Sequence, residues 1–144
     1  MVVLKRLFWG ILCLLCGISV LYASETEDMP DMIEGTTKVF AEDVLRLAET
    51  IDDLLIVDAR IEIDRKQGLI EGSISLPDVD TNCESLARII PTKTTPVLLY
   101  CNGVKCGRSA VSAKIALKCG YSKLYWFRGG FEEWKNKGFP SIKR

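Results

Sequence analysis

The sequence contains no histidine in its 144 residues, and this absence excludes several kinds of site. A cysteine hydrolase of the papain kind needs an imidazole base beside its nucleophile, so this class of enzyme is excluded. A zinc site fails as well, because no imidazole is present and the cysteines are not spaced as paired metal ligands. Any reactive thiol in this chain must therefore be ionised by backbone dipoles and neighbouring cations.

The chain also lacks an excess of charge of either sign. It has 19 basic and 19 acidic residues, and because Lys5 and Arg6 lie in the first segment, 17 basic and 19 acidic residues remain beyond it, a net charge of −2. This balance does not support nucleic-acid binding. Any positive patch must be local.

A long apolar run occurs over residues 7–23, after Lys5 and Arg6 and before an acidic stretch, which is the order of an export signal. Residues 1–23 are therefore predicted to be a signal peptide or an N-terminal membrane anchor. Both interpretations stay open, because Leu21 is bulky for a cleavage site while seventeen apolar residues approach the lower limit of a membrane span. Either way we expect an exported domain, periplasmic in a Gram-negative source, that contacts the membrane only through this segment.

The rest of the chain is predicted to be one domain behind a short linker. Residues 24–37 are acidic and weakly patterned, which indicates a tether, and residues 38–144 have the length and apolar content for one core. Strands are expected at 39–40, 54–57, 74–76, 97–101 and 123–127. Helices are expected at 41–50, 108–118 and 130–137, and a further short helix should end over residues 86–90, before Pro91. This alternation predicts an α/β fold with a mostly parallel sheet of about five strands and helices on both faces.

Cys101 closes the apolar run 97–100 and opens a short loop that leads into the helical pattern from Arg108. The thiol is thus predicted at the carboxyl end of a strand, where α/β sheets bind ligands. Loop N–H groups, a helix N-terminus and the charges of Lys105 and Arg108 concentrate positive potential there. We therefore expect Cys101 to be a nucleophilic thiolate that acts on an anionic substrate. The loop residues expected to bind this substrate are Asn102, Gly103, Val104, Lys105, Cys106, Gly107 and Arg108.

Two other predicted strands end in charged residues at the same edge of the sheet. Asp58 follows one strand, with Arg60 two residues later, and Arg128 follows the last strand. We interpret all three as structural, with hydrogen bonds and an ion pair that shape the floor of the site.

Four cysteines lie beyond the first segment, and an even number permits disulfides in an exported domain, although a domain of this size does not need them. Cys119 stands at a predicted helix end before Gly120 and is interpreted as a small buried hydrophobe. The role of Cys83 stays open. Cys106 has three possible roles: a bystander, a thiol that resolves an intermediate on Cys101, or the disulfide partner of Cys101.

From about Lys38 to the C-terminus, the chain resembles the rhodanese-like domain family. The segments that carry the resemblance are residues 56–60 (IVDAR), residues 68–77 (GLIEGSISLP), the strand, Cys101, loop and Arg108-Ser109 element, and residues 125–134 (YWFRGGFEEW). In this family the loop cysteine takes a sulfane sulfur from a donor such as thiosulfate, holds it as a persulfide and passes it to a nucleophilic acceptor. The resemblance implies a three-layer rhodanese-like fold, a persulfide on Cys101 and no cofactor.

The loop departs from the usual family pattern, because six residues separate Cys101 from Arg108 and one of them is a second thiol. The residues and the resemblance together leave three hypotheses for the function. The leading hypothesis is an exported sulfurtransferase that moves sulfur from thiosulfate or a related small anionic donor to a thiol, protein thiol or cyanide. The alternatives are a phosphatase or arsenate reductase-like enzyme with an enlarged loop, although such relatives carry histidine where this chain has Tyr100, and a non-catalytic or redox module with a Cys101–Cys106 dithiol.

Overall fold

The structure, a computed structural model, describes residues 29–143. The predicted signal peptide or anchor at residues 1–23 lies outside the described residues. The elements are β1 (Thr36–Val39), α1 (Ala41–Thr50), β2 (Leu55–Asp58), α2 (Glu62–Arg65), β3 (Ile74–Ser75), the 3₁₀ turn η1 (Asp78–Asp80), α3 (Cys83–Ile89), β4 (Val97–Tyr100), α4 (Arg108–Lys118), β5 (Leu124–Phe127) and α5 (Gly130–Asn136). Between residues 29 and 143, no helix is long and apolar enough to cross a membrane.

The five strands form one sheet in the order β1-β5-β4-β2-β3, and every pair of neighbours is parallel. β4 lies at the centre, where Leu99 is in register with Val57 of β2 on one side and with Trp126 of β5 on the other. The predicted parallel sheet of about five strands is confirmed.

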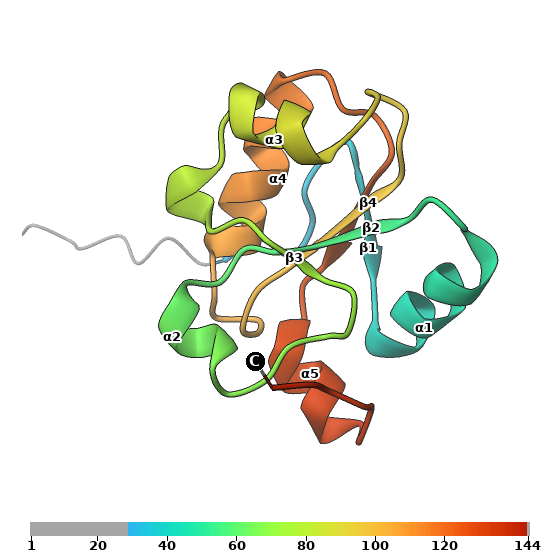
Figure 1. Cartoon of the computed structure of the whole chain (residues 1–144), viewed down its shortest axis with the longest axis vertical. Helices are drawn as coiled ribbons and strands as arrows, with labels where there is room; N and C mark the ends of the chain where they lie inside the picture. The colour runs from blue at the N-terminus through green and yellow to red at the C-terminus, as the bar shows by residue number, and fades with distance from the viewer. Residues whose placement is uncertain (1–28, 144) are drawn as a thin grey trace, which may run out of the picture.

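The helices cover both faces of this sheet (Figure 1). All four residues of β4 are fully buried, because alternate side chains point to opposite layers. Val97 and Leu99 pack in the core beneath α3 and α4, whereas Leu98 and Tyr100 pack in the core beneath α1 and α5. The three-layer α/β architecture predicted from the alternating pattern is therefore confirmed, and it places the end of β4 in the middle of the molecule.

The ordered fold begins earlier than the sequence pattern indicates. β1 starts at Thr36, within the segment predicted as a tether, because Thr36 pairs with Leu124 at the sheet edge. Ile33 is 5% exposed and belongs to the core beneath α4. The 24–37 segment thus contributes a buried side chain and half a strand, features too short for periodicity to reveal.

Arg128 makes structural hydrogen bonds and an ion pair with Asp31, and its partners lie in the segment before β1. Its Nε donates to the Pro30 carbonyl at 2.8 Å and its Nη2 to the Met29 carbonyl at 3.3 Å. The side chain therefore holds the segment before β1 against the carboxyl end of β5. The sequence pattern placed Arg128 at the right edge of the sheet but showed no partner for it.

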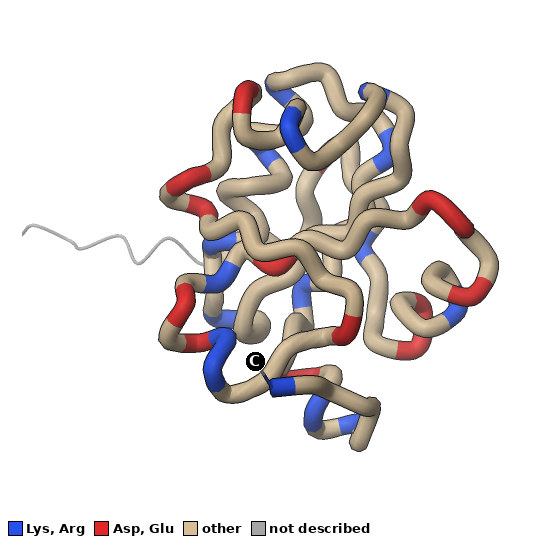
Figure 2. The backbone as a smooth tube through the Cα atoms, in the orientation of Figure 1, with Lys and Arg blue, Asp and Glu red and all other residues tan. Residues whose placement is uncertain are grey.

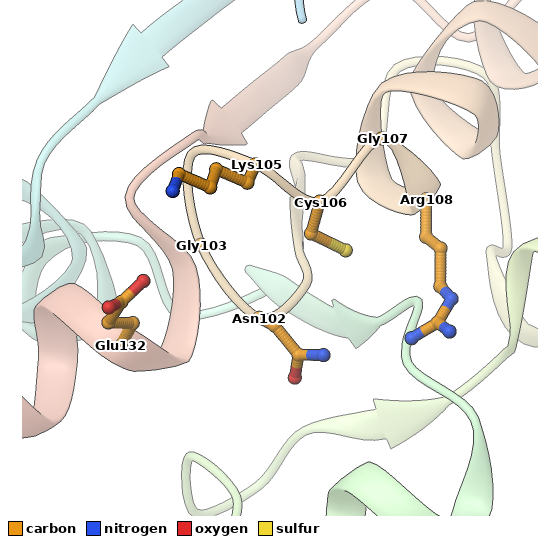
Figure 3. A pocket seen from close by; sticks show the side chains of 7 residues that line it. All are labelled: Asn102, Gly103, Lys105, Cys106, Gly107, Arg108 and Glu132. Carbon is orange, nitrogen blue, oxygen red and sulfur yellow. The ribbon is translucent and has the colours of Figure 1, made fainter.

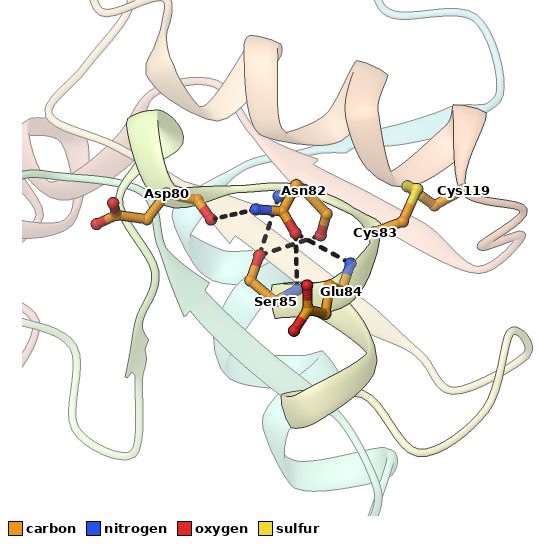
Figure 4. The surroundings of a disulfide bond; sticks show 6 residues. All are labelled: Asp80, Asn82, Cys83, Glu84, Ser85 and Cys119. Atoms are coloured by element: carbon orange, nitrogen blue, oxygen red, sulfur yellow. Dashed lines mark hydrogen bonds between the residues drawn. A yellow bond between two sulfur atoms is a disulfide. The ribbon is translucent and has the colours of Figure 1, made fainter.

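A disulfide joins Cys83, the first residue of α3, to Cys119, which follows α4 (Figure 4). The Asn82 side chain caps α3 by accepting from the backbone N–H groups of Glu84 and Ser85 at 3.0 and 2.9 Å. The interpretation of Cys119 as an unpaired hydrophobe is wrong, because α3 and α4 cover the same face of the sheet and bring the two Cα atoms within 5.5 Å.

Candidate active site

The floor of the site is a cluster of buried charges at the end of β2. The Asp58 carboxylate accepts from Arg60 Nε at 2.9 Å, from Arg60 Nη2 at 2.7 Å and from the Tyr100 hydroxyl at 2.7 Å. Arg65 Nη1 lies 2.7 Å from the same carboxylate. The Arg60 guanidinium also stacks on the Phe131 ring, 4.4 Å from its centroid. Because each buried charge has an opposite partner, this cluster forms a rigid base beneath the loop.

Backbone hydrogen bonds from α5 fix the start of the loop that follows β4. Phe131 N–H donates to the Cys101 carbonyl at 2.8 Å, and Glu132 N–H donates to the Asn102 carbonyl at 2.7 Å. Gly130 has φ +57°, and a Cβ at this position would lie 2.3 Å from the Cys101 carbonyl oxygen. Only glycine allows so close an approach, so the glycine is required for the contact between α5 and the loop.

Cys101 lies beneath the loop and is fully buried, with 0% of its surface exposed. Its thiol donates to the Cys106 carbonyl at 3.0 Å, and its sulfur accepts from the Ser109 hydroxyl at 3.2 Å. Trp126 Nε1 in turn donates to Ser109 Oγ at 3.0 Å. The interaction with Cys106 and the burial both raise the pKa of Cys101, so this thiol keeps its proton. The thiolate expected at Cys101 is therefore not the state that this geometry favours.

Cys106 faces the pocket that opens above the loop. This pocket has a volume of about 430 Å³ and is lined by Asn102, Gly103, Lys105, Cys106, Gly107, Arg108 and Glu132. Figure 3 shows the Cys106 sulfur directed into the space between the side chains of Asn102 and Arg108. The interaction with Cys101, backbone N–H groups of Asn102 and Arg108, and the Arg108 charge lower the pKa of Cys106 to about 6, against the effect of burial. The loop N–H groups and the Arg108 charge thus act on Cys106, whereas the hydroxyl and the backbone N–H of Ser109 act on Cys101.

The two cations of the pocket have different surroundings. Arg108 forms an ion pair with Asp64 of α2, and its Nε lies 3.8 Å from Asp78. Asn102 Nδ2 donates to the same Asp64 carboxylate at 3.0 Å. Lys105 forms no ion pair with any residue of the described part of the chain. Basic and acidic positions are interspersed along the backbone (Figure 2), and the pocket itself holds charges of both signs, with Lys105 and Arg108 opposite Glu132.

Six of the seven residues predicted to bind substrate line this pocket, and Val104 does not. Val104 is 45% exposed at the loop tip and lines a separate hollow against α5. Cys101 lies beneath the pocket and does not line it. Within residues 29–143, no three His, Cys, Asp or Glu side chains are grouped to hold a metal ion.

Sequence reasoning missed three residues that complete the site. Asp64 pairs with Arg108, Glu132 closes one side of the pocket, and Ser109 donates to Cys101. Asp64 lies on a helix of four residues, which is too short to leave a periodic signal. Ser109 and Glu132 lie in the motifs of the family resemblance, but nothing local in the sequence connects them to a thiol.

The family model of the rhodanese-like domain matches residues 40–137, most of the chain. The chain belongs to the rhodanese-like domain family. A curated sulfurtransferase from Allochromatium vinosum is 29% identical over 103 residues, which cover 67% of this chain and 85% of that protein. This relative and the family match make the rhodanese-like chain a member of a sulfurtransferase family.

Solved structures agree with this rhodanese-like fold. Thiosulfate sulfurtransferase from Pseudomonas aeruginosa superimposes with a TM-score of 0.64 at 25% identity, over 75% of this chain and 20% of that chain. The polysulfide-sulfur transferase homodimer from Wolinella succinogenes gives a TM-score of 0.62 at 21% identity, over 76% of this chain and 80% of that chain. At such identity, the second likeness concerns the fold alone.

Proposed function

We propose that this rhodanese-like protein is an exported sulfurtransferase that moves a sulfane sulfur from thiosulfate or a related anionic donor to a thiol or to cyanide. The observation that carries the proposal is the pocket at the end of β4, where a thiol with a lowered pKa lies beside Arg108 at the start of α4. Lys105 supplies a second cation at the same opening. A thiolate and an anion-binding surface are the two requirements for attack on such a donor.

The reaction runs through a persulfide on a cysteine of the loop. The thiolate attacks the outer sulfur of thiosulfate, the S–S bond of the donor breaks, and sulfite leaves with the electron pair. An acceptor thiolate or cyanide then takes the outer sulfur and restores the cysteine thiolate. The sequence predicts Cys101 as the carrier, and Cys106 is the second thiol of the loop.

Export is supported by two separate features of the chain. Residues 1–23 have the order of a signal or anchor. The Cys83–Cys119 disulfide suits an oxidising compartment, because cytosolic reductants keep most thiols reduced. Cell fractionation of the organism that produces the protein tests this proposal, with the protein expected outside the cytoplasm.

Intact mass spectrometry tests the sulfur transfer itself. The full-length protein, treated with a mild reductant that is then removed, should gain one sulfur atom per chain on incubation with thiosulfate. Cyanide should then remove this sulfur and form thiocyanate. The Cys101→Ser/Cys106→Ser double variant is the control and should gain no sulfur. If thiosulfate and polysulfide both leave the mass unchanged while an aryl phosphate is hydrolysed, the phosphatase alternative replaces this proposal.

A further inference from the structure

We infer that Cys106, and not Cys101, is the thiol that attacks the sulfur donor. This inference rests on the proposed sulfurtransferase function and names the residue that begins its reaction. It differs from the assignment that follows from the family resemblance, in which the cysteine directly after the strand carries the sulfur.

Access distinguishes the two thiols. Nucleophilic attack requires the donor sulfur to come within about 3.5 Å of the attacking sulfur along the axis of the bond that breaks. Cys106 lines the pocket, and its sulfur points into the space beside Arg108 (Figure 3). Cys101 has no exposed surface, and the loop covers it. A donor in the pocket therefore reaches Cys106 first.

The helix that follows the loop acts on the same sulfur. Cys106 stands two residues before Arg108, the first residue of the eleven-residue helix α4. The free N–H groups of the first turn make a helix N-terminus favourable for negative charge. The Arg108 side chain lies beside the sulfur and adds a full positive charge. A thiolate and an incoming anion are thus stabilised at one position.

Cys101 acts in this arrangement as a positioning residue. Its thiol donates to the Cys106 carbonyl and fixes the backbone that carries the attacking sulfur. The Ser109 hydroxyl and the Trp126 indole hold Cys101 from the opposite side. A serine at position 101 keeps a donor to the carbonyl, whereas an alanine removes it, so the two substitutions separate the hydrogen bond from the thiol.

The reaction balances with thiosulfate as the only co-reactant. The Cys106 thiolate forms a bond to the outer sulfur, the S–S bond of thiosulfate breaks, and sulfite carries away the electron pair. Cys106 is left as a persulfide anion. No net oxidant or reductant enters this step.

Thiol reactivity without any donor gives the first part of the test. Alkylation of the full-length protein by iodoacetamide, followed by peptide mapping, should label Cys106 first, with a rate that rises with pH and levels off above about 6. Cys101→Ser should keep this profile, and Cys101→Ala should move its midpoint upward. If the cysteine that is alkylated first, and at low pH, is Cys101, the inference is overturned.

Sulfur loading of single variants gives the second part. With thiosulfate, Cys101→Ser should still gain a sulfur atom that maps to Cys106, and Cys106→Ser should lose the gain at least a hundredfold. The reverse pattern, a persulfide on Cys101 that persists in Cys106→Ser, overturns the inference while it confirms sulfur transfer. Failure of the proposed function would look different. Cys106 would still be alkylated first, but neither the wild-type protein nor any variant would gain sulfur.

Discussion

The described part of the chain holds two pairs of cysteines, and the pair that is farther apart in the sequence is the one that forms a disulfide. Cys83 and Cys119 are 36 residues apart and form a disulfide between α3 and the end of α4. Cys101 and Cys106 are neighbours in one loop and remain free thiols. Closeness along the chain therefore does not decide which thiols join.

The surroundings explain the difference. The first pair lies where two helices pack on one face of the sheet, and the packing brings both Cα atoms to a distance suited to a disulfide. In the second pair, the Cys101 thiol donates a hydrogen bond to the Cys106 carbonyl, and the Cys106 sulfur points into the pocket. We interpret the first pair as a structural cross-link and the second as the reactive centre.

Removal of the disulfide should produce the largest effect on stability. Cross-links of this span stabilise by about 3 to 4 kcal/mol through the entropy of the unfolded chain, so Cys83→Ser/Cys119→Ser should lower Tm by roughly 15 °C. Thermal unfolding followed by circular dichroism measures this loss. Sulfur loading at 20 °C should persist, because neither cysteine touches the pocket.

The matched control is Cys106→Ser, which should change Tm by only a small fraction of that amount because its thiol forms no cross-link. If reductant and the double substitution both leave Tm unchanged, Cys83 and Cys119 are not joined in solution. The interpretation of this pair as a structural cross-link is then wrong.

The fold could be predicted because its signals are long. The apolar run that becomes β4 and the helical pattern that becomes α4 are each continuous, and both elements form where the pattern places them. The disulfide could not be predicted, because four cysteines permit several pairings and only the packing of α3 on the sheet selects one. Residues far apart in the chain meet by tertiary packing, which no local pattern encodes.

The site could be predicted only in part for a similar reason. The loop between β4 and α4 has a clear pattern, and five of its residues line the pocket together with Arg108, the first residue of α4. The thiol that faces the pocket could not be chosen, because the choice depends on the turn in which Cys106 N–H donates to the Gly103 carbonyl at 2.9 Å. The partner of Arg108 lies on α2, more than forty residues earlier.

Arg108 should give the next largest effect and should sharpen the assignment of the reactive pair. A hydrogen-bonded contact to a charged group is worth about 1.5 to 3 kcal/mol, so Arg108→Ala should raise KM for thiosulfate tenfold or more. Steady-state kinetics with thiosulfate and cyanide measure this change. Arg108 and Asp64 form an ion pair, which supplies a matched variant.

Asp64→Asn keeps a polar partner for Arg108 and removes the carboxylate charge. If Arg108 binds the anionic donor, Asp64→Asn should lower KM, because the guanidinium is no longer neutralised. If Arg108 serves the loop only through its ion pair, both variants should weaken the enzyme. Opposite changes in KM therefore support donor binding, and changes in the same direction count against it.

Lys105 should give the smallest effect among the groups around the reactive thiols. It lines the pocket but forms no ion pair among the described residues, and exposed charges of this kind contribute little in water. Lys105→Ala should raise KM for thiosulfate about threefold, and the effect should shrink as the ionic strength rises toward 1 M, where the screening length falls to about 3 Å. Kinetics across a salt series measure both quantities.

Lys105→Glu is the stronger comparison, because a negative charge at the same position repels the donor. A loss from Lys105→Ala that exceeds the loss from Arg108→Ala, and that salt does not reduce, would reverse the roles of the two cations and place the donor toward Lys105, away from the Cys106 sulfur.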